Sequence, residues 1–462
     1  MLHHELMLTL LAYTMQTVHA DWTQRGSDFL GESTSYAGGS VSISSDGLIS
    51  TVGAPWGSGF AGTVRVYEFS AGAWNQLGSD IVGEASNDQS GISVSLSSDG
   101  SRVAIGAWEN HVGAEDNAGH VRVYSYAASE WSQLGSDIDG EAAYDNFGIS
   151  VSLNSDGSRV AIGAHGNDGT ASGAGRVRVY SYAASAWGQL GGDMDGAAED
   201  DGFGYSVSLN SDGTRVAIGG EACSYVRVYE FSGITWGQLG VNIDGTAADD
   251  FGWSVSISSD GTRVAIGAPE NDEGGTNAGK VQVFEYAASS WSQMGNNILG
   301  TNSGSNSKGI GYSVSISSDG SRVAIGAPYF SPTVEGTEHS SAGMVRVVDY
   351  SGSDWSPLGS DIYGESVGSN QDNAGWSVAL SADGRSVAVG SRGFNFYSGR
   401  ARIYHDPGLT SAMGDPHITF AHGGSADFRG SHRTFYAFLT SPGFQFAPYF
   451  QEVQTLIEPH TP

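Results

Sequence analysis

The sequence predicts an all-β fold, a seven-bladed β-propeller of four-stranded antiparallel blades closed by an N-terminal strand. The first observation is a repeat of about 56 residues, a period typical of propellers, solenoids and arrays. Glycine is also abundant, at 69 of 462 residues, which fits turn-rich β structure. Two residue types mark all seven copies of the repeat. They are the aspartates of a Ser/Ala-Asp-Gly turn (Asp46, Asp99, Asp156, Asp212, Asp260, Asp319 and Asp383) and the tryptophans Trp22, Trp74, Trp131, Trp187, Trp236, Trp291 and Trp355.

Each repeat contains four short strand patterns, which the copy from Gly252 to Gly295 illustrates. In the first, branched residues such as Val255 alternate with serines, the period of a strand with two unlike faces. The Asp-Gly pair that follows supplies a tight turn into the second strand, 263–268. The third strand covers 281–286, and the fourth surrounds Trp291. Blades with a large face and a small face stack closely around an axis.

The ends of the repeat array are complementary. Trp22 precedes the first complete blade, whereas the last repeat ends near Tyr404 without a tryptophan strand. We therefore predict that the segment at Trp22 supplies the missing fourth strand of the last blade. That pairing would close the ring and remove two exposed strand edges.

Three segments are predicted along the chain. Residues 1–20 contain an apolar run from Leu6 to Met15 and end in Val-His-Ala, a pattern typical of a signal peptide that predicts a secreted, extracellular protein. Residues 21–409 form the propeller, and residues 410–462 a short C-terminal segment. No apolar stretch is long enough to span a membrane.

Composition excludes several classes of partner. The net charge is −30 and the chain has only two lysines, which rules out a basic nucleic-acid-binding surface. The single cysteine, Cys223, rules out an intramolecular disulfide framework. We expect a monomer with no membrane span and no nucleic-acid partner.

Phe251-Gly252 followed by Gly267-Ala268-Pro269 resembles the FG-GAP repeat of integrin α-subunit propellers. Similar pairs and triplets occur at Phe147-Gly148, Phe203-Gly204, Gly53-Ala54-Pro55 and Gly326-Ala327-Pro328. The resemblance covers Trp22 to about Leu409, and it implies a propeller with an extracellular binding, cell-adhesion or scaffold role.

The calcium loops of the integrin-type repeats do not carry over. Their place is taken by tight turns such as Asn210 to Gly213, whereas calcium requires six to eight oxygen ligands. We therefore expect no cofactor, because the shortened turns do not support calcium binding; the sequence leaves calcium dependence open. The metal-ligand candidates that remain are aspartates of two blade connections, Asp200, Asp201, Asp249 and Asp250.

The segment from Gly414 to Gly430 resembles the start of a von Willebrand factor type D domain, on Gly414-Asp415-Pro416-His417 and Asp427-Phe428. Only about 50 residues are present and the family's cysteines are missing, so the resemblance implies a truncated or divergent domain. In some mucin-like members this Asp-Pro bond cleaves itself, which makes Asp415-Pro416 a self-cleavage candidate.

One face of the propeller is the predicted ligand face. Antiparallel order places the second-to-third and blade-to-blade connections on the same side, and these connections vary while the opposite turns do not. The variable side is also acidic, which would attract a basic protein, a polyamine or a divalent cation. Trp253 and Trp376, with Tyr205 and Tyr312 at equivalent positions, are expected at the channel mouth. The ligand-face candidates are Trp56, Trp108, Glu109, Asp116, Glu270 and Asp272.

Most arginines recur with the repeat and are expected to pair with local carboxylates or to cover blade edges. One set of repeat positions holds Arg102, Arg159, Arg215, Arg263, Arg322 and Arg385, and a second holds Arg65, Arg122, Arg178, Arg227, Arg346 and Arg402.

No catalytic residue is assigned, because the sequence lacks a nucleophile elbow, a phosphate-binding loop and a zinc-protease motif. The leading hypothesis is a secreted, non-enzymatic recognition, adhesion or matrix propeller that binds a protein or glycan through its variable acidic face. One alternative is a hydrolase or lyase that uses channel carboxylates; another is a structural coat component.

Overall fold

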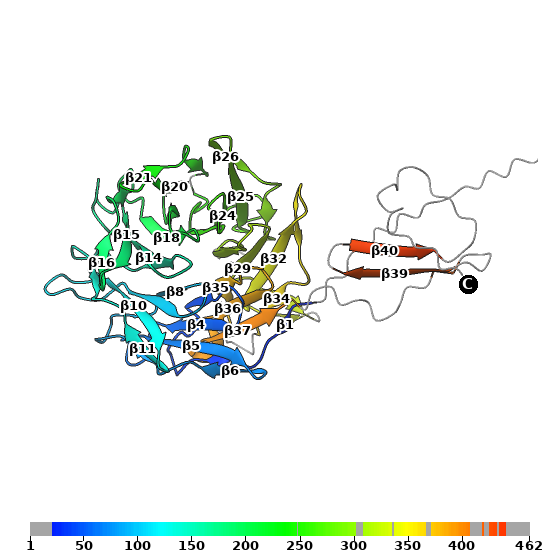
Figure 1. The fold of residues 1–462 in the computed structure, drawn as a ribbon, viewed down its shortest axis with the longest axis horizontal. Helices are drawn as coiled ribbons and strands as arrows, with labels where there is room; N and C mark the ends of the chain where they lie inside the picture. The colour runs from blue at the N-terminus through cyan, green and yellow to red at the C-terminus, as the bar shows by residue number, and fades with distance from the viewer. Residues whose placement is uncertain are drawn as a thin grey trace, which may run out of the picture. The chain divides into compact units, whose positions relative to one another are not determined.

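The computed structural model describes residues 21–246, 248–301, 308–334, 337–365, 371–406, 418–419, 425–431 and 434–439. The chain divides into two compact units. The larger, Trp22–Asp406, consists of seven antiparallel sheets around a central channel (Figure 1). The predicted seven-bladed propeller is confirmed.

The two faces of each innermost strand meet different neighbours, as the alternating sequence predicts. In blade two, Val94 and Leu96 pack against Val64 and Val66 of blade one, while Ser93 faces blade three. The hydrophobic cores therefore lie between blades rather than within them. The innermost strands of blades one to seven are β3 (Ser40–Ile43), β8 (Ser93–Leu96), β13 (Ser150–Leu153), β18 (Phe203–Leu209), β23 (Ser254–Ile257), β28 (Ser313–Ile316) and β35 (Ala374–Leu380).

The remaining strands follow outwards from the channel in chain order. The second strands are β4 (Ile49–Ala54), β9 (Arg102–Ala107), β14 (Arg159–Ala164), β19 (Arg215–Gly220), β24 (Arg263–Ala268), β29 (Arg322–Ala327) and β36 (Ser386–Ser391). The third strands are β5 (Thr63–Ser70), β10 (His120–Ala127), β15 (Arg176–Ala183), β20 (Tyr225–Phe231), β25 (Lys280–Ala287), β32 (Met344–Tyr350) and β37 (Arg400–His405). The fourth strands are β6 (Ala73–Gln76), β11 (Glu130–Gln133), β16 (Ala186–Gln189), β21 (Trp236–Gln238), β26 (Ser290–Gln293), β33 (Trp355–Pro357) and β1 (Thr23–Gln24).

Each sheet also has a fifth, two-residue strand that the sequence analysis did not predict. The third strand is longer than the fourth, so its first residues are paired instead by the chain that leads to the next blade; in blade two, Val121 pairs with Ile138. The buried residue of each short strand anchors this connection. These strands are β7 (Ile81–Val82), β12 (Ile138–Asp139), β17 (Met194–Asp195), β22 (Ile243–Asp244), β27 (Ile298–Leu299), β34 (Ile362–Tyr363) and β2 (Phe29–Leu30). The remaining elements of this unit are β30 (Thr333–Val334), β31 (Thr337–Glu338) and a single turn, α1 (Phe394–Tyr397).

The N-terminal strand closes the ring, as predicted. β1 pairs antiparallel with β37, with Thr23 opposite His405 and Gln24 opposite Tyr404. Figure 1 shows the blue β1 beside the orange β37. The Trp22 indole N–H donates to the Leu358 carbonyl at 2.8 Å. In every blade the repeat tryptophan makes the same hydrogen bond to the preceding blade, at 2.6–2.9 Å.

Two closed rings of hydrogen bonds join the blades around the channel. One consists of backbone bonds between the Asp-Gly turns, at 2.8–3.0 Å, and runs from Ser45 through Ser98, Ser155, Ser211, Ser259, Ser318 and Ala382 back to Ser45. In the other, the first serine of each inner strand donates to a glycine carbonyl of the next blade at 2.7–2.9 Å. The pairs are Ser40 and Gly91, Ser93 and Gly148, Ser150 and Gly204, Ser206 and Gly252, Ser254 and Gly311, Ser313 and Gly375, and Ser377 and Gly38.

The first arginine set joins neighbouring blades, with one correction. Arg102 donates from its guanidinium to the Gly157 carbonyl in the next Asp-Gly turn at 3.1 Å, and Arg159, Arg215 and Arg322 reach the equivalent glycine carbonyls. Arg263 donates to the Asp319 carbonyl of the next turn instead. The assignment of Arg385 to this set was wrong. Arg385 lies two residues after Asp383 rather than three, so Ser386 takes the repeat position. Arg25 reaches the Gly47 carbonyl in its place, at 3.3 Å.

The aspartate of each Asp-Gly turn stabilises that turn. Asp260 Oδ1 accepts hydrogen bonds from the Thr262 backbone N–H at 2.9 Å and from Ser258 Oγ at 2.7 Å. Partial burial acts to raise the pKa of Asp260, but hydrogen bonds to the charged form outweigh it, so the pKa lies below its ordinary value. The pKa is lowered in the same way at four further turns, those of Asp99, Asp156, Asp212 and Asp319.

Because folding lowers the pKa of these turn aspartates, we expect the protein to lose stability in acid. A carboxyl group whose pKa is lowered by folding stabilises the fold above its unfolded pKa of about 3.9 and loses that contribution as the pH falls through the folded pKa. We therefore compare the wild type with a variant carrying Asp99→Asn, Asp212→Asn and Asp260→Asn, in which the acceptor remains but the charge does not. In urea titrations, the difference between their free energies of unfolding should be constant above about pH 5 and shrink below about pH 4. A difference that is independent of pH would contradict the prediction.

In the smaller unit, the described residues form one antiparallel sheet of β38 (Ile418–Thr419), β39 (Ser425–Ser431) and β40 (Thr434–Leu439). The self-cleavage candidates Asp415 and Pro416 lie outside the described residues, as does the predicted signal peptide at 1–20. The type D resemblance of residues 410–462 stays a prediction.

Candidate ligand-binding site at the mouth of the channel

The central channel opens into a cavity of about 260 Å³ lined by the beginnings of the inner strands of all seven blades. Serine, glycine, valine and isoleucine make up most of the lining, and Tyr205, Trp253 and Tyr312 complete it. A hydrolase of the kind considered above would need two carboxylates converging here. Within the described part of the chain, no carboxylate lines this cavity.

Four aromatic residues stand side by side at the channel mouth. Each directly follows the glycine that accepts the serine hydrogen bond, and these glycines have φ between +88° and +99°, a conformation that glycine adopts without strain. The backbone thereby directs the next side chain to the mouth. The four are Tyr205, Trp253, Tyr312 and Trp376, with successive ring centroids 4.7, 5.6 and 4.9 Å apart.

Aromatic residues from other loops continue this arc across the blades that lack one at that position. The His165 ring lies 5.8 Å from Tyr205 and 6.1 Å from Trp108. The rings of Tyr36 and Trp56 are 4.5 Å apart. Thus blades two and three, which have Ile92 and Ile149 where blades four to seven have an aromatic residue, receive Trp108 and His165 from the loops after their second strands.

Two polar side chains close the arc into a ring. Gln89 Oε1 accepts hydrogen bonds from Nε1 of both Trp56 and Trp108, each at 3.2 Å. The Arg392 guanidinium carbon lies 4.1 Å from the Trp376 centroid and 4.5 Å from that of Tyr36. We call the resulting set of half-buried residues the mouth ring: Tyr36, Trp56, Trp108, His165, Tyr205, Trp253, Tyr312 and Trp376.

The mouth ring already holds cations of the chain itself. Lys308 Nζ lies 3.1 Å from the Trp253 centroid, and it pairs with Asp250 at 2.5 Å and Glu270 at 3.6 Å. Together with Arg392, it shows that the aromatic faces accept positive charge, the geometry of a cation–π contact. Burial lowers the pKa of His165 to about 4, so this imidazole is neutral near pH 7.

The structure places the predicted ligand-face residues in two groups. Trp56 and Trp108 belong to the mouth ring, and Glu270 pairs with Lys308 beside it. Glu109, half-buried, follows Trp108 directly. Asp116 instead lies 3.6 Å from His111, and Asp272 accepts from the Asn277 backbone N–H at 2.7 Å.

Three of the four predicted metal-ligand aspartates interact with donors of the protein. Asp201 accepts hydrogen bonds from the Ala198 backbone and from the Tyr225 hydroxyl. Asp249 accepts from Asn271 at 2.7 Å, and Asp250 pairs with Lys308. For the fourth, Asp200, the contact is made by the main chain: its backbone N–H donates to the Ser172 carbonyl.

Sequence reasoning missed Tyr36, Gln89, His165, Lys308 and Arg392 as members of the site. A signal for two of them was present. The position directly after the second strand is proline in blades one, five and six, but it is Trp108, His165 and Arg392 in blades two, three and seven. Comparing that single repeat position would have identified both His165 and Arg392.

Comparisons with known proteins support the fold. Segments 138–180 and 241–284 match the FG-GAP repeat. The first segment begins in the fifth strand β12 and the second two residues before the fifth strand β22, and each ends in the third strand of the next blade, so the matched unit spans a blade junction.

The β-propeller domain of Cps50 (Swd1) from Myceliophteria thermophila is structurally similar, with a TM-score of 0.52 and 11% identity over 83% of this chain and 99% of that one. This likeness concerns the fold alone. No curated protein matches the sequence significantly. Within the described residues, no helix has both the length and the apolar character required to cross a membrane.

Proposed function

We propose that the chain is an extracellular recognition propeller that binds a basic segment of a partner protein at the mouth ring. The observation that carries this proposal is the continuous ring of half-buried aromatic residues around an open cavity, with carboxylates beside it. Concave sites lined by aromatic residues with a few polar groups are the usual form of a binding site.

The chemistry of the ring favours a cationic ligand. Lys308 and Arg392 are bound face-on by Trp253 and Trp376, so the site recognises both kinds of basic side chain within its own chain. The net charge of −30 would attract a basic partner and raise its association rate. Secretion, which the amino terminus predicts, and the FG-GAP repeats, which are typical of extracellular proteins, support an extracellular partner.

Substitution within the mouth ring tests the proposal. Trp253→Ile and Trp376→Ile install the residue that blades two and three carry at the same repeat position, so the backbone is expected to tolerate them. In calorimetric titrations with Lys/Arg-rich peptides, the double variant should bind at least about 10-fold more weakly, the loss of one desolvated cation–π contact. Binding should also weaken with added salt.

Two controls separate this function from its alternatives. Glu130→Gln removes an exposed carboxylate on the outer strand β11, and it should leave binding unchanged. A neutral glycan panel is titrated in parallel. Glycan binding that the double variant abolishes, without peptide binding, would make the ring a carbohydrate site. If neither the peptides nor the glycans bind, the structural coat alternative would be favoured.

A further inference from the structure

A cluster of charged residues recurs at the blade junctions, outside the mouth ring. In blade one, Arg65 of the third strand pairs with Asp80 of its own blade at 2.9 Å and with Glu32 of the preceding connection at 2.8 Å. The same three positions form ion pairs in blade three (Arg178, Asp193 and Glu141) and in blade seven (Arg402, Asp28 and Glu365).

Blade two differs because its third strand begins with a histidine, His120. The equivalent residue is Thr63 in blade one and Arg176 in blade three. Arg122 pairs with Glu84 at 3.2 Å and also donates to the Val82 carbonyl at 3.4 Å. Asp137 accepts from Gln133 at 2.7 Å, and among the ion pairs of the described residues it has no arginine partner.

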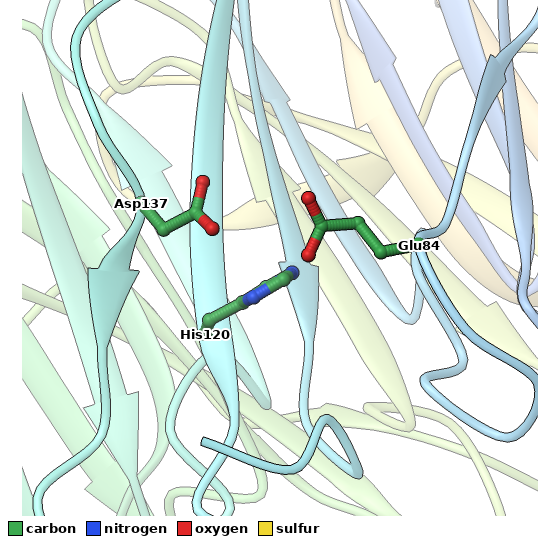
Figure 2. Close-up of side chains that lie close together, drawn as sticks. All are labelled: Glu84, His120 and Asp137. Carbon is green, nitrogen blue, oxygen red and sulfur yellow. The ribbon is translucent and has the colours of Figure 1, made fainter. Parts of the chain in front are cut away.

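His120 lies between two carboxylates. One ligand atom each from Glu84, His120 and Asp137 lies within 4.8 Å of the others. Figure 2 shows the imidazole directed between the two carboxylates, one from the connection after blade one and the other from blade two. The His120 side chain is only 2% exposed, yet its Nε2 has no hydrogen-bond partner within the described part of the chain. A buried polar atom without a hydrogen-bond partner costs folding free energy, and a bound ligand at this nitrogen would remove that cost.

We propose that Glu84, His120 and Asp137 bind one divalent transition-metal ion of the zinc class. An imidazole nitrogen with two carboxylate oxygens is a donor set that zinc accepts, with bonds of about 2.0–2.2 Å. Atoms bound to one such ion lie at most about 4 Å apart, so small side-chain rotations bring the three into range. Three protein ligands leave a fourth position for water or for a donor from a partner.

The charge around the site also suits a cation. Arg122 and the two carboxylates leave a net negative charge at the site, which favours a cation. Cys223 does not compete, because burial raises the pKa of its thiol to about 11.

The test is a titration of metal-free, untagged, full-length protein with Zn²⁺, followed by calorimetry and by the midpoint of thermal unfolding. We expect one strong equivalent of Zn²⁺ per chain and a raised midpoint. Co²⁺ should give the d–d absorption of a low-coordinate site, without a thiolate charge-transfer band. Ca²⁺ at the same concentration should give neither a heat nor a shift.

The other blades supply matched substitutions. His120→Thr copies Thr63, Asp137→Asn copies Asn242, and Glu84→Thr copies Thr246, so each variant carries a residue that the fold already accepts at that position. Each should weaken Zn²⁺ binding at least about 10-fold. His111→Ala, at the exposed pair of His111 with Asp116, is the control and should leave binding intact.

Three results would overturn the proposal: no Zn²⁺ binding by the wild type, full binding by His120→Thr and Asp137→Asn, or a preference for Ca²⁺ that depends on these residues. Because Asp137 lies outside the buried core, its variant remains informative even if His120→Thr is unstable. The proposal does not depend on ligand binding at the mouth ring.

Discussion

A chain that lacks residues 21–30 is expected to lose the closed ring and, with it, independent stability. The deletion removes β1 and β2, both of which pair with β37. It also removes Asp28, which pairs with Arg400 at 2.9 Å and with Arg402 at 3.1 Å. Arg400 is 1% exposed, so a buried guanidinium loses one of its carboxylates. Breaking a buried ion pair alone typically costs about 3–5 kcal/mol.

Losses at the strand edge add to this cost. Without β1, the backbone of β37 is exposed and can pair with another chain. The hydrogen bond from Trp22 to Leu358 and the packing of Phe29, which is 4% exposed, are lost as well. We expect the truncated chain to elute as aggregates in size-exclusion chromatography and to lack a cooperative thermal transition. A monomer with an unchanged midpoint would show that blade seven is stable on its own.

A circular permutant separates ring closure from the loss of particular residues. Gln24 pairs with Tyr404 as Gln293 pairs with Phe284, so Trp22 and Asp406 correspond to Trp291 and Tyr286 of blade five. Four residues, Ala-Ala-Ser-Ser, connect the latter pair and should connect Asp406 to Trp22 equally well. Opening the chain at the exposed turn between Ala128 and Ser129 then moves the closing strand to blade two. This permutant should fold as a monomer, because every strand pair of the propeller is retained.

Most of the fold could be predicted because each structural role is repeated seven times in the sequence. The alternation in the first strand, the Asp-Gly turn and the recurrent tryptophan each act locally or between adjacent blades, so one repeat reveals the rule. The fifth strand was missed because it is only two residues long and its pairing with the third strand depends on the blade connection. Arg385 was misassigned for a similar reason, since a one-residue shift changes the neighbour that a side chain meets.

The candidate site could be predicted only in part, because it is formed where the repeats differ. Trp56, Trp108, Trp253 and Trp376 were recognised as departures from the pattern. The participation of Gln89 depends on two indole groups from different blades meeting at one oxygen. The spacing of residues along the sequence does not reveal such a contact between blades.

The second large effect is expected from Gly163→Ala. A Cβ atom at this position would lie 1.9 Å from the Gly204 carbonyl oxygen and 2.5 Å from Ser150 Oγ. These two atoms form the hydrogen bond that joins blade three to blade four, at 2.7 Å. Because the closest atom belongs to the backbone, relief requires the blades to separate. We expect a loss of about 3 kcal/mol or more in the free energy of unfolding, the upper range for overpacking. Urea denaturation measures it.

Gly188→Ala is the matched control in the same blade. Gly188 lies in the exposed strand β16, where an added Cβ meets nothing within 4 Å, so its effect should stay within about 0.5 kcal/mol. The equivalent of Gly163 in every other blade is also a glycine whose Cβ would lie 2.0–2.2 Å from a carbonyl oxygen of the next blade. Gly267→Ala should therefore reproduce the loss. If both alanine variants are as stable as Gly188→Ala, the distance between blades is not set by these glycines, and close packing around the channel must come from the hydrophobic cores between the blades instead.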